Sequence, residues 1–280
     1  MPDTLLSMPT FAHEGHRFAY TEYGEGPRTV VLIHGLLLSQ RMQAPLARAL
    51  AEHGNRVITI DVLGHGKSDR PRDMWRYSMT HFGEQVVALL DHLGVDEAVI
   101  AGTSLGANIA LEVCALAPDR VRGTVIEMPV LDNALLGCAL AFTPLMVALT
   151  FGEPVMRAVS RLTRLIPDRG PELLQIGLDT IRQDPAPSAA VLQGLFFGRV
   201  APHRSIRRTF TAPALVIGHR RDPVHPFSDS GMLVDELPGG RLLEADSILE
   251  LRVAPERLTN EIARFVDECW KPQGRRAAAA

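Results

Sequence analysis

The sequence has few of the residues that stabilise small secreted domains or attract nucleic acid. Its 280 residues include only three cysteines, Cys114, Cys138 and Cys269, with no paired spacing. That number argues against a disulfide or zinc framework and for a reducing compartment, so we expect a cytoplasmic protein. With 29 Lys and Arg against 32 Asp and Glu, the net charge is −3. No basic field is therefore available for nucleic acid, and we expect no such partner.

Segments that direct a chain to or through a membrane are also scarce. Residues 1–10 lack a basic stretch followed by an apolar run, so we expect no signal peptide. Residues 134–152 carry no charge and approach the roughly 20 residues that span a bilayer. Gly137 and Pro144 interrupt this stretch. We therefore expect buried or covering helices there, without stable membrane insertion.

Histidine is missing where it would be most informative, because none follows His225. The other histidines are scattered, without cysteine or carboxylate partners at metal-ligand spacing. No glycine-rich loop with a phosphate-binding lysine follows a strand. We expect neither a metal nor a cofactor.

Apolar runs that alternate with helical periodicity predict an α/β domain. Short apolar runs predict buried strands, helical spacing predicts the segments between them, and a hairpin is expected over 10–23. The strands are expected at 29–33, 56–60, 97–101 and 123–128, and the helices at 41–53, 80–93 and 104–117. Continuous apolar strands alternating with helices indicate a parallel sheet covered on both faces.

The alternation stops at residue 131 and resumes after residue 208. The segment between is helical and apolar, and strands then follow at 214–218 and 241–244, with a helix over 255–269. We expect a core of residues 1–130 and 209–272, a helical lid of residues 131–208 over the carboxyl ends of the strands, and a disordered tail over 273–280. An apolar lid predicts a pocket for an apolar small molecule, and it also offers a surface for a homodimer.

Gly102-Thr103-Ser104-Leu105-Gly106 lies between a predicted strand and a predicted helix. This context is typical of a nucleophile elbow, in which a serine sits at the tip of a tight turn. Gly102 and Gly106 are small enough for neighbouring backbone to pass close by. The helix N-terminus behind Ser104 favours developing negative charge. We therefore predict Ser104 as a nucleophile.

A second loop, His34-Gly35-Leu36, follows the first buried strand. Gly35 lets the chain turn so that the next N–H points at the site. The N–H groups of Leu36 and Leu105 are then the expected oxyanion donors. We expect the His34 imidazole to hydrogen-bond nearby backbone and to support this loop.

Together these motifs resemble the α/β-hydrolase superfamily, in its lid-bearing, lipase- and esterase-like branch. The likeness runs from about Phe11 to Trp270. It also includes Gly64-His65-Gly66-Lys67-Ser68, Pro118-Asp119-Arg120-Val121, and Gly218 to Asp222. The resemblance implies a mostly parallel sheet with helices on both faces and a helical lid between two strands. It also implies hydrolysis of a small apolar ester or related carbonyl compound through Ser104.

The resemblance assigns Asp222 as the acid of a catalytic triad, and Glu127 holds the other acid position used in the superfamily. The superfamily pattern places the base histidine near Ile248, where this sequence has none. Without a base, a serine hydroxyl is a poor nucleophile. Three nearby arginines, expected chiefly on the solvated surface, offer positive charge for an anionic ligand: Arg220, Arg221 and Arg252.

Three interpretations follow from the missing histidine. In the first, another histidine replaces it: His225 is the leading candidate, His219 flanks the same loop, and His34 and His81 come after. In the second, the protein acts without an activated serine, as a lyase or a cofactor-free enzyme. In the third, it is a ligand-binding or scaffold protein without catalysis. A weak, promiscuous esterase is the remaining alternative.

Overall fold

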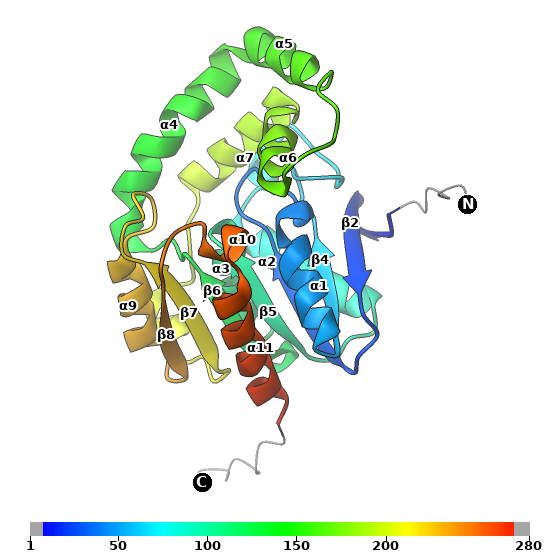
Figure 1. Ribbon diagram of the computed structural model, residues 1–280. Coiled ribbons are helices and arrows are strands. Elements are labelled where there is room, and N and C mark those ends of the chain that lie inside the picture. Colours follow the sequence, from blue (N-terminus) through cyan, green and yellow to red (C-terminus); the bar gives the residue numbers. More distant parts are fainter. Residues whose placement is uncertain (1–7, 272–280) are drawn as a thin grey trace, which may run out of the picture.

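An eight-stranded sheet forms the centre of the molecule (Figure 1). The computed structural model describes residues 8–271. The tail expected over 273–280 lies outside the described residues. Most of the segment 1–10, where we expect no signal peptide, lies outside them as well. The strand order is β1-β2-β4-β3-β5-β6-β7-β8. The strands are β1 (Thr10–His13), β2 (His16–Tyr23), β3 (Arg28–Ile33), β4 (Asn55–Ile60), β5 (Ala98–Thr103), β6 (Val121–Glu127), β7 (Ala214–His219) and β8 (Gly240–Ala245).

The six strands from β3 to β8 pair in parallel, whereas β1 and β2 form an antiparallel hairpin that joins β4. The parallel register aligns the carboxyl ends of the central strands. Gly102 on β5 lies opposite Ile33 on β3, and Thr103 lies opposite Glu127 on β6. The loops that follow these strands therefore meet at one edge of the sheet, where ligands bind in such folds.

Helices cover both faces of the sheet, because alternate strand residues point to opposite sides. Val31 and Ile33 belong to one apolar cluster with α2 (Met79–His92), α3 (Leu105–Leu116) and α9 (Phe227–Glu236). Val30 and Leu32 belong to the other, with α1 (Ala44–Glu52), α10 (Glu250–Val253) and α11 (Glu256–Trp270). The predicted two-sided parallel sheet is confirmed. Sequence periodicity did not anticipate α9 or α10.

A helical insertion, residues 131–208, separates β6 from β7 (Figure 1). Its helices are α4 (Leu135–Phe151), α5 (Glu153–Thr163), α6 (Glu172–Ile181), α7 (Pro185–Phe197) and α8 (Arg204–Arg207). In Figure 1, α4 runs along the edge of the molecule to α5, and α6 and α7 return toward the sheet. Short 3-10 turns complete the chain: η1 (Gln40–Gln43), η2 (Met74–Arg76), η3 (Pro118–Arg120) and η4 (Asp132–Ala134).

The insertion is tied to the core at its root by Asp229 on α9. The fully buried Asp229 carboxylate accepts hydrogen bonds from the N–H groups of Leu131, Asn133 and Ala134, at 2.8, 3.1 and 3.0 Å. The side-chain amide of Asn133 donates to it as well, at 2.8 Å. These four hydrogen bonds to one buried carboxylate hold residues 131–134 in place.

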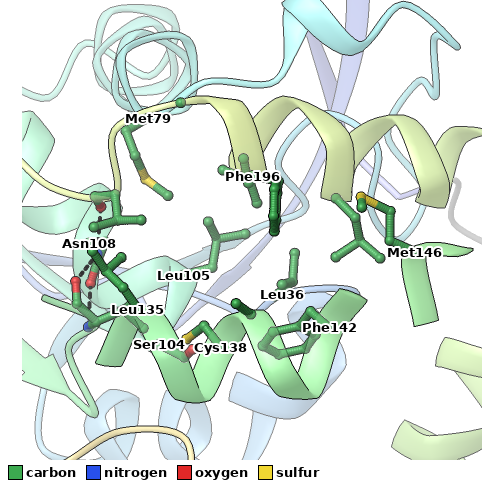
Figure 2. Close-up of a pocket in the computed structure, with 16 residues that line it drawn as sticks. Leu36, Met79, Ser104, Leu105, Asn108, Leu135, Cys138, Phe142, Met146 and Phe196 are labelled. Carbon is green, nitrogen blue, oxygen red and sulfur yellow. Dashed lines mark hydrogen bonds between the residues drawn. The ribbon is translucent and has the colours of Figure 1, made fainter. Parts of the chain in front are cut away.

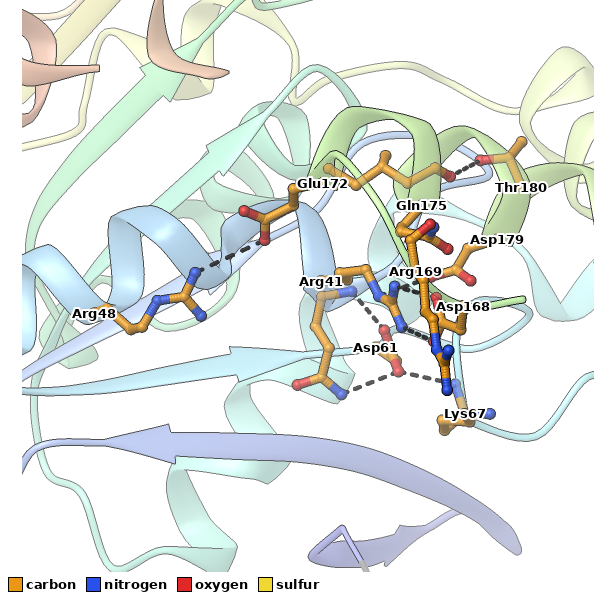
Figure 3. Close-up of polar contacts among 12 residues, drawn as sticks. Arg41, Arg48, Asp61, Lys67, Asp168, Arg169, Glu172, Gln175, Asp179 and Thr180 are labelled. Carbon is orange, nitrogen blue, oxygen red and sulfur yellow. Dashed lines mark hydrogen bonds and ion pairs between the residues drawn. The ribbon is translucent and has the colours of Figure 1, made fainter. Parts of the chain in front are cut away.

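The middle of the insertion, around α6, meets the core through ion pairs (Figure 3). Arg41 binds Asp168 at 2.9 Å and Asp179 at 3.0 Å. Arg48 lies 3.8 Å from Glu172. These contacts join α6 and its preceding loop to η1 and α1. The insertion is thus held at residues 131–134 and again around α6, and its function as a lid stays a prediction.

Candidate active site

Ser104 sits on a strained turn between β5 and α3. Its φ of 53° and ψ of −111° fall in a region that residues with a Cβ rarely adopt. A Cβ on Gly102 would lie 2.2 Å from the Gly106 backbone, and one on Gly106 would lie 2.4 Å from the Ile33 carbonyl oxygen. The two glycines are therefore required by close backbone contacts, and Ser104 on this turn lines the cavity.

Three predicted site residues meet in one chain of hydrogen bonds. Ser104 Oγ lies 2.9 Å from His225 Nε2, and His225 Nδ1 lies 2.9 Å from Asp222 Oδ2. Asp222 and His225 come from the same loop after β7, only three residues apart. We call residues 222–225 the acid–base turn.

The acid–base turn is held by its own backbone. Asp222 Oδ1 accepts hydrogen bonds from the N–H groups of Val224 at 2.8 Å and His225 at 2.9 Å. The Asp222 side chain is 4% exposed and that of His225 is 15% exposed. Burial favours protonation of Asp222, but the hydrogen bonds from the His225 side chain and the two backbone N–H groups outweigh it and lower its pKa. The carboxylate is therefore held ionised against the imidazole.

The N-terminal half of α4 packs on this turn. A Cβ on Gly137 would lie 3.2 Å from the Pro223 carbonyl oxygen, and Cys138 Sγ lies 4.0 Å from the Val224 carbonyl oxygen. The helical insertion thus contacts the loop that carries His225.

Leu36 and Leu105, whose N–H groups are the expected oxyanion donors, line the same cavity as Ser104. Leu105 is the first residue of α3, where an N–H group has no acceptor within its own helix. The His34 ring, which is fully buried, bonds the Gly35 carbonyl at 2.8 Å and accepts from the Val62 N–H at 3.2 Å. His34 thus shapes the loop, and burial lowers its pKa.

The cavity beside Ser104 has a volume of about 380 Å³ and is apolar (Figure 2). Figure 2 shows Phe142 on α4 and Phe196 on α7 on facing helices. The Asn108 side chain accepts a hydrogen bond from the Val130 N–H and donates to the carbonyl oxygens of Val130 and Val200. The lining residues, none of them charged, are Leu36, Met79, Ser104, Leu105, Asn108, Val130, Leu135, Cys138, Ala139, Phe142, Met146, Leu192, Leu195, Phe196, Gly198 and Val200.

The region of the missing histidine holds a buried ion pair instead. Ile248 is 41% exposed. Arg252, on the short helix α10 that follows, reaches Glu127 Oε2 and Thr103 Oγ1, both at 3.0 Å. The Arg252 and Glu127 side chains are 10% and 4% exposed. The expectation of a solvated surface position is wrong for Arg252, because it neutralises a carboxylate that β6 buries beside the elbow.

None of the remaining described candidates hydrogen-bonds the Ser104 side chain. Among the described residues, neither ring nitrogen of the buried His219 has a hydrogen-bond partner. His81 on α2 lines a separate hollow with Trp75. Arg220 pairs with Glu244 on the surface, and Arg221 is exposed. Within residues 8–271 no group of three or more His, Cys, Asp or Glu side chains is arranged to hold a metal ion.

Comparison with known proteins supports the α/β-hydrolase fold. A family model described as the alpha/beta hydrolase fold matches residues 28–143, which include Ser104 but not the acid–base turn. Bifunctional epoxide hydrolase 2 of Sus scrofa is 35% identical over 124 residues, 43% of this chain and 22% of that protein. Epoxide hydrolase B of Mycobacterium tuberculosis is 37% identical over 117 residues, 40% of this chain and 32% of that protein. The matched span is a third or less of these two relatives.

Solved structures match over nearly the whole chain. An enol-lactonase from Burkholderia xenovorans LB400 superposes with a TM-score of 0.75 at 21% identity, covering 92% of this chain and 100% of that one. A hydrolase from Pseudomonas aeruginosa PA01 gives a TM-score of 0.77 at 20% identity, covering 94% and 99%. At these identities the likeness concerns the fold. The matched model and the solved structures together show that the chain has the α/β-hydrolase fold.

Proposed function

We propose that the protein is a serine hydrolase that cleaves a small, neutral, apolar ester, with His225 in place of the usual base. The observation that carries the proposal is the hydrogen-bond chain from Ser104 through His225 to Asp222. A serine within hydrogen-bond reach of an imidazole that a buried carboxylate orients is the arrangement that activates a hydroxyl.

The reaction would run in two halves. Ser104 Oγ attacks the carbonyl carbon while His225 Nε2 takes its proton, and Asp222 stabilises the imidazolium. The N–H groups of Leu36 and Leu105 bind the oxyanion. His225 then gives the proton to the leaving alcohol. Water repeats these steps on the acyl-enzyme, which releases the acid and restores Ser104.

The cavity supports the choice of substrate. Because no charged side chain lines it, an anionic acyl group would lose its hydration without compensation. A volume of about 380 Å³ holds roughly a dozen non-hydrogen atoms at the ~30 Å³ that one water occupies. An apolar acyl chain of medium length fits this space, and each buried methylene contributes about 0.8 kcal/mol.

The test is turnover of nitrophenyl esters. We expect kcat/KM for the hexanoate ester to exceed that for the acetate by at least about tenfold, with the anionic hemisuccinate the poorest. Ser104→Ala should abolish turnover, and Ser247→Ala, at an exposed serine, should not. Folded protein that turns over none of these esters and resists a fluorophosphonate probe would favour the non-catalytic, ligand-binding interpretation instead.

A further inference from the structure

The helix α4 is apolar on all sides and yet largely exposed. The 20-residue helical segment Asp132–Phe151 is long and apolar enough to cross a membrane by length and composition, and only 11% of its apolar window is buried. A helix that is apolar all round is normally buried in a core or in lipid. The exposure of α4 therefore calls for a partner that covers it.

The two faces of α4 are different surfaces. Cys138, Phe142 and Met146 line the cavity beside Ser104 (Figure 2). Leu136 and Leu140, one turn apart, are each 71% exposed, and Phe151 at the end of the helix is 82% exposed. Exposed apolar side chains continue past the end of α4. We call the whole set the apolar ridge: Leu136, Leu140, Phe151, Val155, Leu162 and Leu165.

Positive charge accompanies the apolar ridge. Residues 135–166 contain three arginines and one acidic residue, Glu153. Arg157 pairs with Glu153 and also lies 3.8 Å from Asp184 on the neighbouring segment. Arg164 donates to the Arg182 carbonyl oxygen, and Arg161 has no hydrogen-bond or ion-pair partner among the described residues. This segment is therefore positive, although the chain carries −3.

The charge selects among the surfaces that would cover the ridge. Two copies of this chain facing one another through the ridge would bring like charges together, which opposes a dimer here. Anionic lipid headgroups attract arginine beside an apolar helix face, while acyl chains cover the face itself.

We propose that the apolar ridge docks on the surface of an anionic phospholipid membrane. The segment lies on the bilayer and does not span it, because Asp229 fixes its root and Arg41 binds Asp168 beyond its other end (Figure 3). Docking brings the outer face of α4 into the headgroup region while its inner face still lines the cavity. An apolar ligand dissolved in the membrane is thereby concentrated next to the cavity.

The test is flotation of the full chain with lipid vesicles, using a Ser104→Ala background so that binding is measured without turnover. We expect binding to vesicles with about a third phosphatidylglycerol and little binding to phosphatidylcholine alone. The double substitution Leu140→Gln with Phe151→Gln should weaken binding by at least about tenfold. Arg161→Glu should weaken it by at least about fivefold, since each basic residue near the surface contributes about 1 kcal/mol.

Two matched controls lie outside the ridge. Trp75→Gln changes an apolar side chain that is 70% exposed, and Arg208→Glu changes an exposed arginine; neither should alter binding. Each substitution is also made in the chain that retains Ser104. Fluorophosphonate labelling and thermal melting of these variants report whether they fold.

Four results would overturn the proposal. These are absence of wild-type flotation, equal binding to neutral vesicles, equal loss in the control variants, or a dimer that the double substitution dissociates while vesicles are ignored. Because binding is measured with Ser104 removed, its failure leaves the proposed hydrolase untouched, and a failure of hydrolysis leaves the vesicle result standing.

Discussion

The buried pair of Arg252 and Glu127 gives a prediction whose size follows from its surroundings. Its guanidinium and carboxylate are 3.0 Å apart and almost fully buried, and the Thr103 hydroxyl bonds both. Removing one partner from such a pair leaves a buried charge uncompensated, at a cost of about 3–5 kcal/mol. We expect Glu127→Gln to lie near the lower limit, since the Arg252 side chain retains 10% exposure.

Replacing both partners should be far less costly. Arg252→Met alone leaves the Glu127 carboxylate with the Thr103 hydroxyl, and we expect a loss of about 3 kcal/mol or more. The double variant, Glu127→Gln with Arg252→Met, buries no charge at this position. Its unfolding free energy should therefore fall within about 2 kcal/mol of that of the wild type. Urea denaturation measures all four proteins. If the losses of the two single variants sum to the loss of the double variant within about 0.5 kcal/mol, the coupling is refuted.

The same variants test which acid serves His225. Glu127 contacts Thr103 and Arg252 through its side chain, whereas Asp222 contacts the His225 ring. Folded Glu127→Gln should therefore keep its fluorophosphonate labelling rate, and Asp222→Asn should lose it by about 10³-fold or more. Loss of labelling in Glu127→Gln alone would return Glu127 to the site as the acid.

Three further changes probe the parts that position the site. Gly106→Ala forces a Cβ to within 2.4 Å of the Ile33 carbonyl oxygen, so thermal melting should show a loss of about 3 kcal/mol or more; an unchanged melting temperature would refute the required close contact. Asp229→Ala leaves three backbone N–H groups without their acceptor. Urea unfolding should show that the free energy of unfolding falls by about 2–4 kcal/mol. A negligible change would mean that water replaces the carboxylate. Burial, with the negative charges of Asp229 and Asp222, raises the pKa of the Cys138 thiol to about 11. Iodoacetamide at pH 8 should then alkylate Cys138 at least about tenfold more slowly than an exposed cysteine, with the rate rising toward pH 11, and rapid labelling at pH 8 would contradict this.

The sheet and the elbow could be predicted because their signals are local. Continuous apolar runs mark buried strands, and a serine between two glycines at a strand–helix junction has few structural alternatives. The short helix α10 escaped prediction because its four residues are fewer than one apolar repeat. The α9 helix escaped because it follows directly on the acid–base turn, where Pro226 obscures its start.

The sequence could rank His225 above the other histidines, but it could not place the ring beside Ser104. The direction of the ring depends on a turn closed by Asp222 Oδ1, which accepts two backbone N–H groups, and no periodicity encodes that closure. The burial of Arg252 was missed for a related reason, because its partner Glu127 lies 125 residues away in sequence. The exposure of α4 was equally hidden, since a helix that is apolar all round has no polar face to reveal its orientation.

The central claim is that His225 activates Ser104. The most direct measurement is the rate at which a fluorophosphonate probe labels the wild type, His225→Ala and a control variant, His203→Ala. His203 is an exposed histidine at the N-cap of α8. Intact mass would locate the label by its loss in Ser104→Ala. We predict that His225→Ala slows labelling by about 10³-fold or more while His203→Ala labels at the wild-type rate. Labelling of folded His225→Ala at the wild-type rate would contradict the account.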